Sequence, residues 1–347
     1  MSAPFRIDLR DVSTFPTRRD EAWRWSDLRR ALGGEPVVAA AFEIEPPGEG
    51  GPFASIAADE TVFANGRLAD GETLARLTLA DKPHRLRFVT SAEEGGWQAG
   101  ADVVVPAGVS ATLLETYEGR GAYVASAILR FSLGADASVE RIVLLEEPAA
   151  AVSISASAVS LGAGAHFAQT VVATGAKLQR HETHVVHPGG GASVRMDGLY
   201  LLADTRHADL TTVVVHEGGG ETSQMCKGVA TDRARAVFQG QIVVKPGADG
   251  TDARMRHDAL LLSDTAEVDA KPELEIYADD VSCAHGNTVG ALDEEALFYI
   301  ASRGVPEAEA KALLMQGFIG EVVERITHEG AREVVRAFAA ERLEALT

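Results

Sequence analysis

The segment "DDVSCAHGNTVG" at residues 279–290 places a thiol and an imidazole two residues apart. On a β-strand, residues i and i+2 lie on the same face, so Cys283 and His285 would point the same way, about 6.5–7 Å apart. A thiolate with an imidazole suits iron or zinc, but two ligands do not complete a tetrahedral site. The pair is therefore either half of a metal site, completed by Cys226 or by a second chain, or a buried thiol beside a hydrogen-bonded histidine.

Two other motifs contain residue types that are used in binding, and we interpret both as structural. The histidines of "HETHVVH" at 181–187 are three apart, which is not the spacing of the helical zinc motif. On a strand His181 and His184 face opposite sides, so we expect surface histidines beside a turn. The glycine runs at 189–191 and 218–220 are not followed by Lys-Ser/Thr, so we expect chain corners there rather than phosphate loops.

A repeat of roughly 27 residues runs through the middle of the chain. Segments of the form Gly-x-x-Ala-x-apolar have their alanines at Ala111, Ala137, Ala165 and Ala192. Short β-branched runs lie between these segments, and several of them alternate with period two. A winding chain explains the period, because glycine allows a tight corner and the small alanine fits a narrow interior. We predict a mainly β fold, a parallel β-helix over residues 61–290 with about eight circuits; a β-sandwich, with turns every 8–12 residues, is the less favoured alternative.

The two ends of the chain lack this repeat. Residues 1–60 are predicted to form an N-terminal helical segment, with a helix at 16–32 followed by a Gly- and Pro-rich linker. Residues 291–347 are predicted to form a C-terminal helical domain, in which Asp293 is an N-cap and Glu294 occupies the first turn. Its expected helices span 292–304, 306–327 and 331–346.

The composition narrows the class of function. Asp and Glu outnumber Lys and Arg by 51 to 32, which gives a formal charge of −19. Such a surface repels nucleic-acid phosphates and anionic lipid. No apolar stretch is long enough to span a bilayer, the N-terminus lacks the apolar core of a secretory signal, and two cysteines argue against a disulfide framework. We expect a cytoplasmic, reduced protein with no nucleic-acid or membrane partner.

One long stretch resembles a known family. Residues 271–304, "KPELEIYADDVSCAHGNTVGALDEEALFYIASRG", resemble the SufB/SufD family, together with residues 227–276 and 16–28. Members of this family are scaffold subunits of the bacterial Suf iron–sulfur cluster assembly machine. The Cys-x-His-Gly form is similar to the D-type members, whereas B-type members usually carry Ser-His-Glu at this place. Asn287 and Cys226 depart from the family pattern, which commonly has a small residue at the first position and an aromatic or apolar residue at the second.

The resemblance implies a right-handed parallel β-helix between helical ends and a non-enzymatic scaffold role. It implies pairing with SufB through the last strands, near Cys283 and His285, with the histidine implicated in iron acquisition and cluster formation. It also implies binding of the SufC ATPase through the C-terminal helices, where we expect contributions from Asp293, Glu294, Leu297, Phe298, Tyr299 and Arg303. We therefore expect no stably bound cofactor, but transient iron or an iron–sulfur cluster shared with the partner chain.

Two alternatives stay open. Some parallel β-helix proteins cleave carbohydrates with acidic and basic residues in a groove, although Asp279 and Asp280 would face opposite sides if both lay on a strand. The second alternative is a structural homodimer, in which Cys283 and His285 have no metal role.

Overall fold

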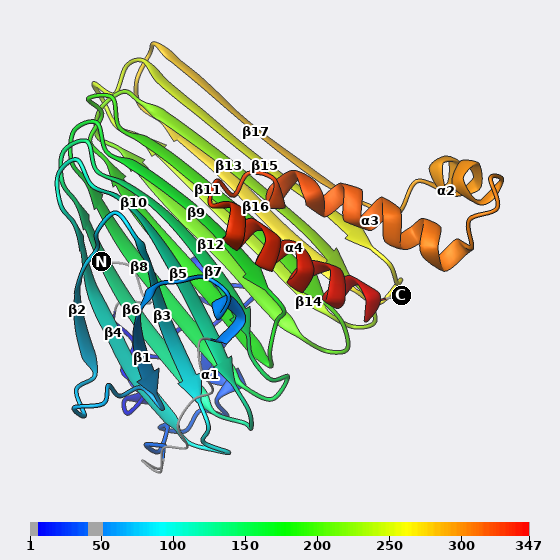
Figure 1. Cartoon of the computed structure of the whole chain (residues 1–347), viewed down its shortest axis with the longest axis horizontal. Coiled ribbons are helices and arrows are strands. Elements are labelled where there is room, and N and C mark those ends of the chain that lie inside the picture. Colours follow the sequence, from blue (N-terminus) through cyan, green and yellow to red (C-terminus); the bar gives the residue numbers. More distant parts are fainter. Residues whose placement is uncertain (1–5, 41–50, 347) are drawn as a thin grey trace.

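The computed structural model describes residues 6–40 and 51–346, and most of them wind into a parallel β-solenoid of about eight turns (Figure 1). The odd-numbered strands form a nine-stranded sheet: β1 (Asp59–Ala64), β3 (Pro83–Thr90), β5 (Ser110–Gly119), β7 (Ser138–Glu146), β9 (His166–Ala173), β11 (Ser193–Leu202), β13 (Glu221–Ala230), β15 (Thr251–Leu261) and β17 (Val281–Gly290). The even-numbered strands form an eight-stranded sheet: β2 (Leu74–Thr78), β4 (Gly96–Val105), β6 (Val124–Leu133), β8 (Val152–Leu161), β10 (Leu178–His187), β12 (His207–His216), β14 (Arg235–Val244) and β16 (Glu267–Ile276). The predicted parallel β-helix is confirmed.

The repeated Gly-x-x-Ala segments form corners of the solenoid, as predicted. Their alanines are all buried: Ala111, Ala137, Ala165 and Ala192. A Cβ atom at Gly134 would lie 2.6 Å from the backbone nitrogen of Ala107 in the corner below, and one at Gly162 would lie 2.7 Å from that of Ala135. Glycine is therefore required at these corners because the stacked backbones approach too closely for a side chain.

The interior of the solenoid also contains charged and polar groups. Arg141 donates to both carboxylate oxygens of Glu115, at 2.8 Å each, and to the amide oxygen of Gln169 at 2.7 Å. The Arg141 and Glu115 side chains are completely buried. A buried pair of this kind is tolerated only when its hydrogen bonds are made, as they are here.

The histidines of the 181–187 motif were expected on the surface, and this expectation is wrong for two of them. His181 and His187 point into the solenoid and are 2% and 0% exposed. The Nδ1 atom of His181 lies 2.7 Å from the Ser155 hydroxyl oxygen, and the His187 ring stacks on His216 with ring centroids 4.4 Å apart. The strand alternation was predicted correctly, since His181 and His184 do lie on opposite faces, but the face that carries His181 and His187 is the interior one. The neighbouring glycine runs do lie at corners, as predicted.

The N-terminal segment packs on the outer face of the eight-stranded sheet. Its apolar side chains, with those of the sheet, form one buried cluster: Ile7, Leu9, Phe15, Trp23, Leu28, Val152, Ile154 and Leu178. Besides the short turn η2 (Val12–Thr14), the segment contains a 3-10 turn, η3 (Glu21–Trp23), and a short helix, α1 (Leu28–Ala31). A further 3-10 turn, η4 (Gly51–Phe53), lies on the outer face of the nine-stranded sheet instead, where Phe53 packs in the same cluster as α3 and α4.

The helix predicted at 16–32 is therefore wrong. The Ser26 hydroxyl donates to the Asp209 carboxylate of the sheet, and the Asp27 carboxylate accepts from the backbone N–H of Arg30, which starts a new helix there. These side-chain hydrogen bonds compete with a continuous helix.

The C-terminal residues form three helices, α2 (Glu294–Ala301), α3 (Glu307–Val323) and α4 (Glu329–Glu344). The first two are shorter than predicted, and α4 has the predicted length but lies two residues earlier in the chain. Figure 1 shows α3 and α4 lying on the outer face of the nine-stranded sheet, whereas α2 projects away from it. Buried residues of α3 and α4 pack against Leu114, Ile142, Leu144, Val172 and Leu199.

Polar contacts fix α3 and α4 on two strands of the sheet. On β11, the Asp197 carboxylate accepts from Arg325 at 2.9 Å. On β7, the Glu140 carboxylate accepts from the backbone N–H groups of Thr327 and His328, and Glu146 pairs with Arg342. Across the described ranges 6–40 and 51–346, no helix combines the length and apolar character that crossing a membrane requires.

Candidate functional site

The last turn of the solenoid is open. β17 pairs with β15 in parallel register, and β16 pairs with β14, but among residues 6–40 and 51–346 neither strand has a neighbour on its other side. The backbone N–H and C=O groups on those sides are therefore available to another chain. All residues of β17 are exposed except Val281 and Cys283, which are half-buried.

Cys283 and His285 face the interior axis at this open end. In the strand below, Cys283 aligns with Ala253 and His285 aligns with Met255, and both of those residues are buried in the core. Aligned residues of parallel strands share a face, so the two side chains lie on the same face of β17, as predicted. The Cys283 thiol packs against the core, and burial raises its pKa. The His285 ring is exposed and makes no side-chain hydrogen bond within the described residues.

Cys226 does not complete this pair. It lies on β13, two strands below β17, and aligns with His257 and then Asn287. It is therefore offset from Cys283 by four residues along the strand, or about 13 Å. Burial raises the pKa of the Cys226 thiol well above its usual range. In the part of the chain that the structure describes, no three His, Cys, Asp or Glu side chains are grouped to hold a metal ion.

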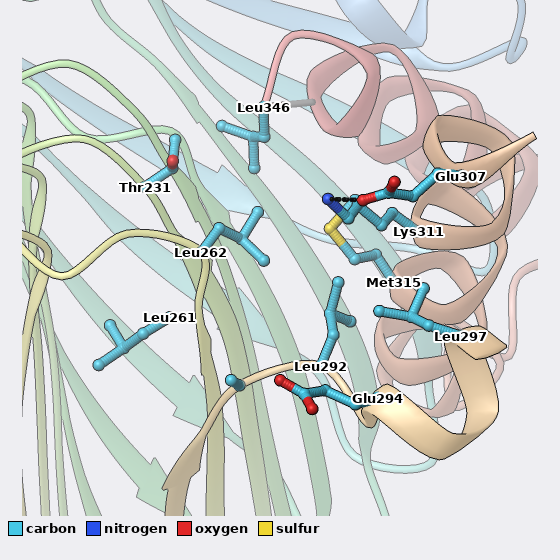
Figure 2. Close-up of a pocket in the computed structure, with 11 residues that line it drawn as sticks. Thr231, Leu261, Leu262, Leu292, Glu294, Leu297, Glu307, Lys311, Met315 and Leu346 are labelled. Atoms are coloured by element: carbon cyan, nitrogen blue, oxygen red, sulfur yellow. Dashed lines mark ion pairs between the residues drawn. The ribbon is translucent and has the colours of Figure 1, made fainter.

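A second feature is a groove between the last corners of the solenoid and the C-terminal helices (Figure 2). Its volume is about 610 Å³, and apolar side chains line most of it: Leu261, Leu262, Leu292, Leu297, Met315 and Leu346. The polar side of the groove carries Glu294 and an ion pair between Lys311 and Glu307, 2.7 Å apart. The groove therefore offers an apolar floor with an acidic margin.

The structure divides the six residues predicted to contact an ATPase into three groups. Asp293 caps α2, and its carboxylate accepts from the backbone N–H of Glu295 at 2.9 Å. Two others line the groove, namely Glu294 and Leu297.

The remaining three residues form an exposed aromatic face on α2 and the turn that follows it. Phe298 and Tyr299 are 76% and 59% exposed. Arg303 donates to the Tyr299 hydroxyl at 2.7 Å, and its guanidinium lies over that ring, 4.5 Å from the centroid. Exposed aromatic side chains with an arginine are typical of the centres of protein interfaces.

The sequence analysis missed two sets of residues. The groove residues Lys311 and Met315 meet Leu262 only in the folded chain, and no local spacing indicated this. Asn287 and His257 form a hydrogen bond between neighbouring strands, with 2.7 Å between Oδ1 and Nδ1. The two residues are about one repeat apart in sequence, and this spacing could have predicted that they lie side by side in neighbouring turns.

Comparison with known proteins identifies the family. Residues 88–318 match the family model described as "SUF system FeS cluster assembly, SufBD core domain". This chain belongs to the SufBD family. The matched region begins within β3 and extends into α3, so it includes the open last turn and α2. The family resemblance inferred from residues 271–304 is confirmed.

Individual relatives match this SufBD chain to different extents. The iron-sulfur cluster assembly protein SufD of Escherichia coli is 38% identical over 170 residues, which cover 49% of this chain and 40% of that protein. SufD of Bacillus subtilis is 36% identical over 126 residues, covering 36% of this chain and 29% of that protein. A SufBD family protein of Mycobacterium bovis is 28% identical over 373 residues, covering 99% and 92%. The chain thus spans less than half the length of Escherichia coli SufD in its match.

Proposed function

We propose that this chain is a non-catalytic scaffold subunit for iron–sulfur cluster assembly and acts in the cytoplasm as the D-type partner of SufB. The observation that carries the proposal is the open last turn, where two unpaired strand edges flank a thiol and an imidazole. Unpaired edges are suited to pairing with another chain through backbone hydrogen bonds. The relatives named as iron–sulfur cluster assembly proteins support the assembly role.

Cys283 and His285 would supply part of the ligand set for iron, which is the cargo of this protein. A thiolate and an imidazole both bind iron, and the remaining ligands would come from SufB. Iron binding displaces the thiol proton, so the burial that raises the pKa of the Cys283 thiol makes a proton compete with iron at this position. A site divided between two chains can also release its contents when the chains separate.

The C-terminal helices would bind the SufC ATPase. The exposed face of Phe298 and Tyr299 supplies aromatic anchors, and the groove beside α2 supplies an apolar pocket. Since α3 and α4 cover an apolar face of the solenoid, deletion of all three helices would also damage the fold. Point variants on α2 are therefore the sharper test.

The iron role is tested by co-expressing the chain with SufB and SufC and purifying the complex without oxygen. His285→Ala is expected to retain both partners and to lose most of the iron and sulfide. Thr288→Ala, on the opposite face of the same exposed strand, is the matched control and should load normally. Wild-type iron and sulfide in the His285→Ala complex would refute the role of this imidazole.

The ATPase contact is tested with the double variant Phe298→Ala/Tyr299→Ala. Loss of two aromatic anchors is expected to weaken SufC binding at least roughly tenfold in a titration. Leu313→Ala on α3 removes another exposed apolar side chain and should have little effect. Equal affinity of wild type and double variant would place the SufC contact elsewhere.

The carbohydrate-active alternative needs a lateral groove with available acids and bases. A groove of about 400 Å³ beside the end of α4 contains Glu146, Arg206 and Arg342. These charges are already engaged, because Arg342 pairs with Glu146 and Arg206 donates to the carbonyl groups of Glu147 and Gly175. The groove therefore resembles a structural ion-pair cluster more than a substrate site.

A further inference from the structure

Within the residues described by the structure, Asn287 is the one side chain of β17 that forms a hydrogen bond to another side chain of the solenoid. β17 is an edge strand at the open end, so backbone hydrogen bonds hold it from one side only (Figure 1). On its inward face, Val281 and Cys283 pack against the core and His285 makes no hydrogen bond. The Oδ1 atom of Asn287 lies 2.7 Å from Nδ1 of His257 on β15.

His257 is a rigid attachment point for this hydrogen bond. It is fully buried, and its ring stacks on Phe238 with centroids 5.0 Å apart and planes within 6°. Its Nε2 atom lies 3.0 Å from the hydroxyl oxygen of Tyr200, which is also buried. The hydrogen-bonded chain thus extends from the exposed strand across β15 to β11.

The partners of His257 determine its tautomer. The Asn287 amide oxygen can only accept, so the proton must be on Nδ1 of His257. Nε2 then accepts a hydrogen bond from the Tyr200 hydroxyl, which burial keeps protonated by raising the pKa of Tyr200 well above its usual range. Both ring nitrogens of His257 therefore have a hydrogen-bond partner, and the Nδ1–H group fixes the direction of the Asn287 amide oxygen.

We propose that Asn287 is a positioning residue, which anchors the free end of β17 to the His257–Tyr200 pair and thereby holds Cys283 and His285 in register and orientation. His285 is two residues from the anchor on the same face. Without the anchor, the last half of β17 would be held by its backbone ladder to β15 and by the packing of Leu292 just beyond it. The consequence for iron rests on the proposed function, whereas the anchor itself does not.

The anchor is tested on the isolated full-length chain with Asn287→Ala and the control Thr288→Ala. Hydrogen exchange of residues 281–290 is expected to be roughly fivefold faster in Asn287→Ala, the effect of losing one hydrogen bond. Because Tyr200 still donates to Nε2, His257 keeps its Nδ1–H tautomer, and nitrogen NMR is expected to show a changed chemical shift for Nδ1 alone, as that N–H loses its acceptor. Thr288→Ala should change neither measurement.

Two results would overturn the anchor. One is equal exchange rates in the two variants, and the other is faster exchange in Asn287→Ala with an unchanged Nδ1 chemical shift of His257. In the purified complex with SufB and SufC, Asn287→Ala is expected to lower iron loading several-fold although both proposed ligands are present. Normal loading despite a loosened β17 would overturn the positioning role. Normal loading of His285→Ala would instead overturn the proposed function and leave the anchor intact.

Discussion

The middle turns and the last turn of the solenoid use the same backbone geometry but differ in what covers them. On β15, Met255 is 2% exposed, whereas His285, directly above it on β17, is exposed. The outer faces of the middle turns are covered as well, by the N-terminal segment on one sheet and by α3 and α4 on the other. The end of the stack therefore makes interior-facing side chains accessible without any enclosed pocket. Substitutions should act on stability in the middle and on binding at the end.

The largest effect on stability is expected when one member of the buried ion pair in the middle turns is removed. Arg141→Met leaves the Glu115 carboxylate buried without its cation, which should lower the free energy of unfolding by about 3–5 kcal/mol. Urea denaturation measures the loss. Arg254→Ala, which breaks an exposed pair with Asp252 beside the last turn, should leave the urea midpoint unchanged. Equal midpoints for the two variants would contradict the distinction.

A second test enlarges a side chain in each region. Ala165→Leu forces extra volume into a filled corner and is expected to cost about 1–3 kcal/mol in the free energy of unfolding. Ala284→Leu places the same side chain on the exposed face of β17 and is expected to change it by less than about 0.5 kcal/mol. Thermal and urea unfolding measure both. Tolerance of leucine at Ala165 would show that the corner is loosely packed.

The smallest expected effect is a pH dependence of stability that comes from one buried carboxyl group in the middle turns. Burial raises the pKa of Glu147, next to β7, to about 7. Between about pH 6 and pH 8 the folded carboxyl loses its proton, whereas the unfolded one is already ionised. The wild type should therefore lose about 1 kcal/mol of stability as pH rises through this window.

The matched variants for this test are Glu147→Gln and Glu267→Gln. The glutamine of Glu147→Gln does not titrate. Between about pH 6 and pH 8 the unfolding free energy of this variant, relative to that of wild type, should therefore increase by about 1 kcal/mol. Both ends of this window, about pH 6 and about pH 8, lie above the isoelectric point of about 4.9. Glu267→Gln, at the exposed start of β16, should follow the wild-type pH dependence. A parallel pH dependence of Glu147→Gln and wild type would contradict the buried, protonated state.

Periodic features were predictable from the sequence because they repeat. The Gly-x-x-Ala corners recur in four successive turns and alternating strands recur along the solenoid, so a local pattern was enough to predict the overall fold. The helix at 16–32 failed because Ser26 and Asp27 form hydrogen bonds whose partners include Asp209, far away in the chain. His181 and His187 were misplaced because their neutral, buried state depends on partners from other strands.

The candidate site was predictable only in part. The shared face of Cys283 and His285 followed from strand geometry, and the structure places them at an open end. That Cys226 lies away from Cys283 depends on the strand register. The two cysteines are about two repeats apart in sequence, but the register places them four residues apart along the strand direction. The groove beside α2 joins corners and helices that no single segment contains.

The attachments of α3 and α4 decide where a mechanical load would enter the molecule. Glu140 and Asp197 bind the junction between these helices to β7 and β11, in the middle of the stack. A force on α3 would be spread over several hydrogen-bonded turns before reaching β17. A force on α2 would act directly on the end of β17 through residues 291–293. The fold thus connects α2 directly to the last turn, whereas α3 and α4 are attached to the middle turns of the solenoid.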